Sequence, residues 1–206
     1  MQKLSAGSWP GARERPKQRG LGSRKAKSGE MMEFSFVLKY RLAESNQDLD
    51  DVIERLAEAG CDDSLIGTGT AGRIALDFTR EAESADAAVF SALSDVKRAL
   101  PDAELIEAGP DYVGLSDIAN IIGVSRQYMR KLWTENSSSF PPPVHAGSAS
   151  LWHLADVLNW LSAKGSFESE KAGILQIADT AMQVNIAKGQ SRTKLDSCKL
   201  FLPLVA

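Results

Sequence analysis

The chain has 206 residues, of which 43% are hydrophobic and 25% are charged, and its formal net charge is −3. This length suffices for one or two domains with hydrophobic cores, and no apolar run approaches the roughly 18 residues of a membrane-spanning helix. The two cysteines, Cys61 and Cys198, and two histidines lack the spacing of a disulfide framework or a structural zinc site. The basic N-terminus has no apolar signal core, so we expect a cytoplasmic protein without a membrane segment, metal or cofactor.

Charge is distributed unevenly along the chain. Residues 1–30 carry eight Lys and Arg against two Glu, whereas residues 31–110 carry seven basic residues against seventeen acidic ones. The next segment, 111–165, has four of each, and 166–206 has five basic and four acidic residues. Such blocks indicate segments with different roles. The predicted segments are a disordered basic tail over 1–32, an α/β domain over 33–110, a second small domain over 111–165, and a C-terminal helix and tail over 166–206.

The tail is rich in Gly, Ser, Lys and Arg and has no apolar periodicity, so it is predicted to be disordered. One interpretation is a dispensable extension. Another is that translation begins at Met31 or Met32. A third makes the tail an arm that contacts a polyanionic partner.

The acidic segment alternates strand and helix patterns. Strands are predicted over Phe34–Leu42, Ser64–Ile66, Arg73–Phe78 and Glu104–Ala108, and helices over Asp48–Gly60 and Ser84–Leu100. The apolar stripe of the first helix consists of Leu49, Val52, Ile53, Leu56 and Ala57. The order βαββαβ predicts an α+β, ferredoxin-like domain with a four-stranded antiparallel sheet and two helices on one face. No catalytic set of residues stands out, and the helical carboxylates predict a solvated face or a docking surface for a basic partner.

One motif in this segment matches a nucleotide-binding pattern. Gly67–Gly72 (GTGTAG) fits G-x-G-x-x-G letter for letter. In a dinucleotide site the glycines open a helix whose N-terminus faces the pyrophosphate, but here Arg73–Phe78 predicts a strand. The motif is therefore interpreted as a hairpin turn in which glycine adopts positive φ. A nucleotide-binding enzyme is the minor alternative.

From Tyr112 the pattern changes to two short helices. Apolar positions spaced i, i+3, i+4 and i+7 from Leu115 predict the first, with Ser116 as its N-cap and Gly123 as its left-handed terminator. Ser125 is predicted to cap the second helix, which spans 125–133 and turns Met129, Leu132 and Trp133 inward. Two short helices joined by a tight glycine turn predict a helix-turn-helix.

Polar side chains remain on the outer side of the second helix. They are Arg126, Gln127, Tyr128, Arg130 and Lys131. Arg makes a two-pronged contact with guanine and Gln with adenine, and the first two turns of a recognition helix reach the base edges. Lys131 and the Tyr128 hydroxyl suit phosphates. The alternative is a purely structural helical hairpin with solvated polar side chains.

Residues 140–165 predict a hairpin and a third helix. The strands are expected over Pro143–His145 and Ser150–Trp152, with a turn over 146–149. The helix is expected from Leu154, capped by His153, to Lys164–Gly165. This order predicts a winged helix-turn-helix, with Trp152 and Trp160 in its core.

The stretches LSDIANIIGVSRQYMRKLW, FPPPVHAGSASLW and DVLNWL give residues 112–164 a resemblance to the AlpA-like and excisionase-like winged helix-turn-helix domains, relatives of the MerR type. The resemblance implies that Ser125, Arg126, Gln127 and Arg130 enter the major groove. It also implies that a wing with His145, Ser148 and Ser150 touches the backbone or the minor groove. Family wings often carry Arg or Lys, which this wing lacks.

The leading hypothesis is a sequence-specific DNA-binding transcriptional regulator, or an excisionase-like factor, that is not an enzyme and binds double-stranded DNA as a homodimer. The basic tail is then a candidate DNA-contacting arm. The alternative is a protein-interaction adaptor or antitoxin-like protein whose acidic domain binds a partner. Candidate dimer interfaces are an edge or face of the sheet and a helix predicted over 168–187, whose apolar stripe needs a partner surface within the chain or on a second copy. The apolar run 200–206 has no predicted place.

Overall fold

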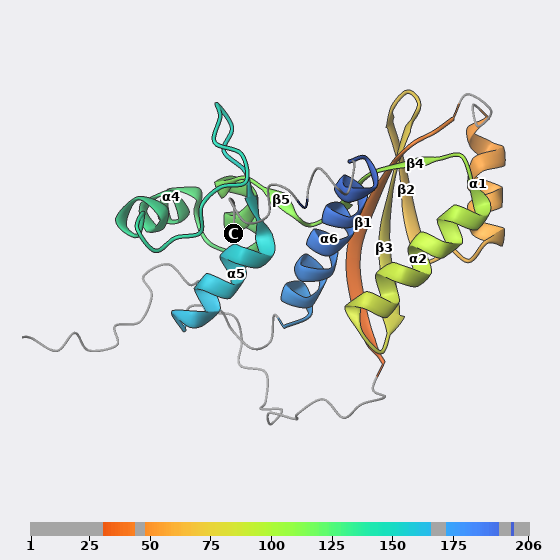
Figure 1. Cartoon of the computed structure of the whole chain (residues 1–206). Coiled ribbons are helices and arrows are strands. Elements are labelled where there is room, and N and C mark those ends of the chain that lie inside the picture. The colour runs from red at the N-terminus through yellow and green to blue at the C-terminus, as the bar shows by residue number, and fades with distance from the viewer. Residues whose placement is uncertain (1–30, 44–47, 166–171, 194–198, 200–206) are drawn as a thin grey trace, which may run out of the picture.

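A computed structural model of the chain describes residues 31–43, 48–165, 172–193 and 199. Within these ranges it is a mixed α+β structure with a four-stranded antiparallel sheet, a two-stranded ribbon and six helices (Figure 1). None of these helices is long and apolar enough to cross a membrane. The elements are β1 (Met32–Arg41), α1 (Leu49–Glu58), β2 (Ser64–Thr70), β3 (Arg73–Ala82), α2 (Ala85–Ala99), β4 (Glu104–Gly109), β5 (Tyr112–Val113), α3 (Leu115–Ile122), α4 (Arg126–Glu135), β6 (Trp152–His153), α5 (Leu154–Ala163) and α6 (Ala172–Ser191).

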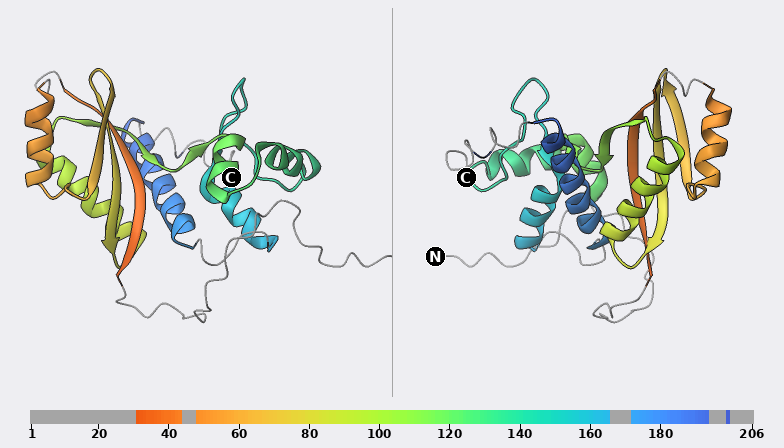
Figure 2. Two further views of the ribbon diagram at one scale, coloured as in Figure 1. Left: turned by 180° about the vertical axis from the view of Figure 1, so that it is seen from behind. Right: turned by 45° about the vertical axis from the view of Figure 1, so that its right-hand side comes forward.

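The sheet has the strand order β2-β3-β1-β4, and every neighbouring pair is antiparallel. Side chains alternate along β1, so that Phe34, Phe36 and Leu38 are buried while the residues between them lie on the open face. The buried face is covered by α1, α2 and α6, with α2 in contact with both of the others (Figure 2). The opposite face carries mostly polar side chains and is uncovered by any described element.

All six elements predicted between residues 33 and 110 are present in the predicted order, with different ends. β2 and β3 each extend four residues beyond the predicted strand, to Thr70 and Ala82. The extension of β3 was not predicted because it begins with three polar residues, Thr79, Arg80 and Glu81. The predicted stripe of α1 is only partly right: Val52 and Leu56 are buried, whereas Leu49, Ile53 and Ala57 are exposed. This short helix reaches the core with a narrower face than its sequence predicts.

The glycine motif forms the hairpin between β2 and β3. Thr70 pairs with Arg73 across a two-residue turn, and Gly72 adopts φ +69°. β3 follows the turn directly, so no helix N-terminus stands at this position. The hairpin interpretation is confirmed.

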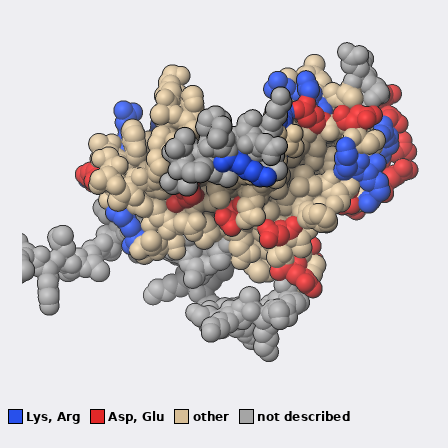
Figure 3. Space-filling view, in the orientation of Figure 1, with Lys and Arg blue, Asp and Glu red and all other residues tan. Residues whose placement is uncertain are grey.

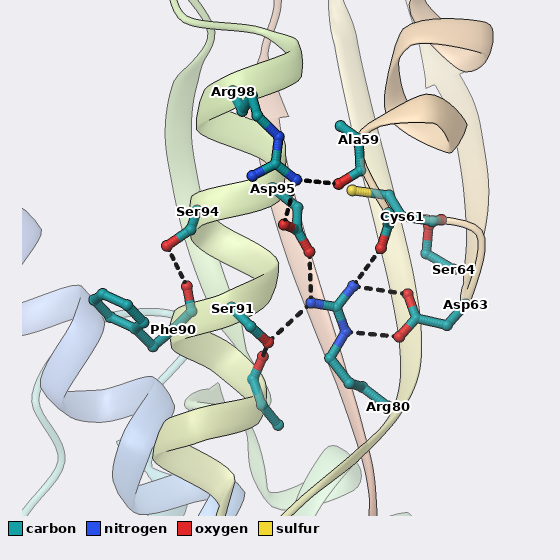
Figure 4. Close-up of polar contacts among 12 residues, drawn as sticks. Ala59, Cys61, Asp63, Ser64, Arg80, Phe90, Ser91, Ser94, Asp95 and Arg98 are labelled. Atoms are coloured by element: carbon teal, nitrogen blue, oxygen red, sulfur yellow. Dashed lines mark hydrogen bonds and ion pairs between the residues drawn. The ribbon is translucent and has the colours of Figure 1, made fainter.

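A buried arginine, Arg80, joins the end of β3 to the segment between α1 and β2 and to helix α2 (Figure 4). Arg80 donates two hydrogen bonds to the carboxylate of Asp63, at 2.6 and 2.9 Å, and others to Asp95 at 2.8 Å and Ser91 at 2.9 Å. The hydrogen bonds to Asp63 raise the pKa of Arg80 above its usual value. Its guanidinium also bonds the Gly60 carbonyl, so the charge is fully paired in a site that is only 9% exposed. This arginine has a structural role.

Helix α6 lies between two hydrophobic clusters. Ile177 and Ala181 belong to the cluster under the sheet, whereas Ala178 belongs to the cluster formed by α3, α4 and α5. The helix ends at Ser191, four residues beyond the predicted end, and the predicted start over 168–171 lies outside the described ranges. Of the two partner surfaces predicted for its apolar stripe, the structure shows the one within the chain.

A buried polar junction fixes α6 to both clusters. The Asn185 amide donates to the Ala108 carbonyl at 2.8 Å and to Asp111 Oδ2 at 2.7 Å, and its oxygen accepts from the Ala108 N–H at 2.9 Å. Asp111 is 0% exposed and lies 2.6 Å from His153 Nδ1 through its other oxygen. Asn185 therefore occupies the free edge of β4 in place of a neighbouring strand. Because Asp111 and Asn185 are buried, their polar atoms have no water to bind and are satisfied by one another and by Ala108 and His153.

We expect Asn185→Ala to lower the free energy of unfolding by about 3 kcal/mol, because the substitution leaves Asp111 and both peptide groups of Ala108 short of partners in a buried site. Urea unfolding followed by circular dichroism measures this change. Gln190→Ala, on the exposed surface of the same helix, is the matched control and should stay within about 0.5 kcal/mol of wild type. Equal stability of the two variants would contradict the role given to the junction.

Candidate nucleic-acid interface

Helices α3 and α4 are joined by a tight turn at Gly123. This glycine adopts φ +79°, and its N–H bonds the carbonyls of Ala119 and Asn120 at 3.0 and 3.3 Å. Val124 then donates to Ala119 at 2.9 Å, which completes the helix end. A residue with a Cβ is strained at this φ, so the turn explains the glycine. The predicted left-handed terminator is confirmed.

The two helices are capped in different ways. Ser125 is the N-cap of α4, as predicted, and its Oγ accepts a hydrogen bond from the Tyr128 N–H at 3.1 Å. The prediction that Ser116 caps α3 is wrong, because that helix begins at Leu115 and Gly114 is its N-cap. Asp117, the third residue of the helix, reaches back and accepts a hydrogen bond from the Gly114 N–H at 2.9 Å, which is the N3 half of a capping box.

The inner faces of α3, α4 and α5 meet around Trp152. This side chain is 1% exposed, lies edge-on to Trp133 and Phe140 at ring-centroid distances of 5.9 and 6.1 Å, and donates its indole N–H to the Pro141 carbonyl at 3.0 Å. Met129 is fully buried in the same cluster, while Leu132 and Trp133 are half-buried. The predicted inner face of the second helix is therefore confirmed. Trp160 is half-buried at the margin of this core, packed against Phe140.

The outer side of α4 presents most of the predicted contact residues to solvent. Ser125, Arg126, Gln127, Arg130 and Lys131 are all exposed. Lys131 lies 3.7 Å from Glu135 on the next turn, a surface pair of small energetic value. No carboxylate of the described residues pairs with Arg126 or Arg130. The prediction for Tyr128 needs correction, because its side chain is half-buried instead of projecting freely.

The predicted hairpin is smaller than expected. A single bridge joins His145 to Leu151, with backbone hydrogen bonds of 2.8 to 3.4 Å on both sides of it. The expected strands over Pro143–His145 and Ser150–Trp152 are not formed, because Trp152 pairs instead with Val113 of β5. That ribbon was not predicted from the sequence. At the hairpin, His145 and Ser148 are exposed and Ser150 is half-buried.

His153 has a different role from the one predicted. It is the N-cap residue of α5 by position, but its side chain makes no capping hydrogen bond. Its ring is held by Asp111 and lies 5.3 Å from the ring of Tyr112. Asp111 and Asn185 were both missed by the sequence analysis, since a lone Asp and a lone Asn carry no pattern that predicts their pairing.

Basic atoms lie above α4, on the side toward which the 143–151 hairpin points, and also below it (Figure 3). The hairpin itself carries no Lys or Arg. Lys164, at the end of α5, lies 4.4 Å from the ring centre of Trp160 and donates to Asn136 at 2.5 Å. Within the described ranges, no three His, Cys, Asp or Glu side chains converge on a possible metal site. What this surface offers chemically is a set of guanidinium, amide and ammonium donors on a rigid helix.

Comparison of the chain with family models, with curated proteins and with solved structures finds no match. The resemblance of residues 112–164 to AlpA-like domains therefore remains a proposal.

The two serines provide a matched test of the capping geometry. Ser125→Ala should lower the free energy of unfolding by about 1 kcal/mol because an N-terminal N–H of α4 loses its acceptor. Ser116→Ala, inside the first turn of α3, should change it by less than about 0.5 kcal/mol. Thermal unfolding of both variants measures the difference. A larger loss for Ser116→Ala would contradict the assignment of Gly114 as the cap.

Proposed function

We propose that the protein is a sequence-specific double-stranded-DNA-binding regulator, or an excisionase-like factor, that reads the major groove with α4. The observation that carries this proposal is the outer face of that helix. Arg126, Gln127 and Arg130 are exposed together in its first turns, while Met129 anchors the helix from behind. Arg and Gln are the side chains that make two-pronged contacts with guanine and adenine.

The anchoring of α4 supports the proposal because base readout needs a rigid platform. The Gly123 turn, the Ser125 cap and the buried Met129 fix the start, the axis and the rotation of the helix. Because the backbone of α4 is already ordered, binding through its exposed side chains costs less conformational entropy. A loop with the same residues would lack this advantage.

Local electrostatics also favours the proposal, although residues 111–165 carry no net charge. Of the four carboxylates in this segment, Asp111 is buried in the polar junction, Asp117 caps α3, and Asp156 lies on a different helix, in the first turn of α5. Glu135 lies at the far end of α4 from Arg126. The first turns of α4 are thereby left with uncompensated positive charge, which phosphate and guanine attract.

The same proposal includes the finer description of the fold. We assign residues 33–110 as a ferredoxin-like domain, from the order of its elements and the strand order β2-β3-β1-β4. We assign residues 111–165 as a winged helix-turn-helix of the AlpA-like type, with the 143–151 hairpin as a short wing. A homodimer would double the phosphate contacts and read a repeated or palindromic site.

A second candidate function is protein binding by the acidic domain, and one observation favours it. Phe90 on α2 is 73% exposed and lies beside Leu93, Lys97 and Arg98 in an open depression. A large apolar side chain at this exposure is typical of interaction surfaces. Two results together would favour this function over DNA reading. Light scattering would give a lower particle mass for Phe90→Ser than for the wild-type chain, and the wild-type chain would select no DNA sequence.

The test of the proposed function begins with selection of duplexes from a randomised pool by the wild-type chain. On the selected duplex, Arg126→Ala and Arg130→Ala should each weaken binding by about 1–3 kcal/mol, roughly 5-fold to 150-fold, because each removes a base contact. Fluorescence anisotropy measures the affinity, and thermal melting confirms folding. Lys97→Ala, an exposed cation on α2, is the control and should bind like wild type. The proposal is wrong if no sequence is enriched, or if both arginine variants bind as tightly as the control.

A further inference from the structure

Two hairpins project toward the same side of the molecule. One is the turn between β2 and β3, and the other is the 143–151 hairpin beside α4. All three views, turned about one vertical axis, show both of them reaching upward (Figures 1 and 2). The space-filling view shows Lys and Arg atoms on this side both above α4 and beside the β2–β3 hairpin (Figure 3). A duplex bound on this side of the molecule would therefore face both hairpins.

The base of the β2–β3 hairpin carries a cluster of arginines. Arg41 and Arg73 are directly opposite each other on β1 and β3, an arrangement that costs free energy between like charges. Glu104 pairs with Arg41 and with Arg192, which follows α6. One carboxylate thus pairs with two of the three guanidinium groups. Among the described residues, Arg73 has no ion-pair partner, and it is exposed.

This cluster stands out because the rest of the domain is acidic. Residues 31–110 contain seventeen Asp and Glu against seven Lys and Arg. The buried Arg80 and the paired Lys39 have partners that explain their positions. The fold itself gives no such explanation for Arg73, which is exposed at the base of the β2–β3 hairpin.

The tip of the hairpin is built from small residues. Thr68, Gly69, Thr70, Ala71 and Gly72 are all exposed, and none has a side chain large enough to keep a nucleic-acid backbone away. Threonine hydroxyls and backbone N–H groups are donors that proteins use toward phosphates. No atom lies within 4 Å of the Cβ position at Gly69 or Gly72, so the tip is open on its outer side.

We propose that the β2–β3 hairpin is a second DNA-contacting element, in which Arg73, assisted by Arg41 and Arg192, binds backbone phosphates of the duplex that α4 reads. This inference rests on the proposed function. It gives the protein the phosphate contact that its uncharged wing lacks. It also turns a cationic edge of the acidic domain toward DNA.

The test compares Arg73→Gln with wild type on two duplexes that share the selected site. The short duplex contains the site alone, and the long one extends it by about two helical turns, roughly 21 bp, on each side. Affinity for DNA falls as salt rises, so log affinity against log salt has a negative slope. On the long duplex, Arg73→Gln should make this slope less steep by about 0.9, the contribution of one phosphate contact. On the short duplex the slope should be unchanged. Lys97→Gln is the matched control and should retain the wild-type slope on both.

The outcomes separate this inference from the proposed function. A wild-type slope for Arg73→Gln on the long duplex overturns the inference, while the effects of Arg126→Ala and Arg130→Ala still stand. An equal fall on both duplexes overturns it too, because the contact would then lie within the site of α4. If the wild-type chain binds neither duplex, the proposed function and this inference fail together.

Discussion

The arrangement of the two halves of the molecule depends on the buried contact between Asn185 and the end of β4. The amide group satisfies both peptide groups of Ala108 and one oxygen of Asp111, and the other oxygen of Asp111 holds His153. A carboxylate without solvent is costly unless each oxygen has a donor, so the junction forms completely or is strongly destabilised. Helix α6 is thereby fixed in one position against the sheet and against α5.

This constraint gives the proposed DNA-binding surface its geometry. A flexible link would let the acidic domain rotate over α4 and compete with DNA for its arginines. With α6 packed into both clusters, the two hairpins instead lie on the same side of the molecule (Figure 1). In the proposed complex, the acidic domain contributes through Arg73 at its edge and, by its overall charge, disfavours binding that does not depend on sequence.

Much of this architecture follows from local patterns in the sequence, and the part that does not has a physical reason. Ser125 and Gly123 act within one helical turn, so their residue types predict the helix ends correctly. The prediction of Ser116 as the cap was wrong because the helix starts two residues earlier, where Gly114 is the N-cap and its N–H donates to Asp117. The pairing of Val113 with Trp152 and of Asp111 with Asn185 spans long stretches of chain, and single residues carry no period that reveals such contacts. For the candidate site, the exposed side of α4 was predictable from helical spacing, whereas the arginine cluster required strand register to bring Arg41 beside Arg73.

The central claim is that α4 reads base edges in the major groove, and methylation interference tests it most directly. Dimethyl sulfate places a methyl group on guanine N7 in the major groove and on adenine N3 in the minor groove, so each groove is probed separately on one duplex. Our account predicts that methylation at guanine N7 within the selected site removes those molecules from the bound fraction. Interference confined to adenine N3, or none at any position, would contradict it.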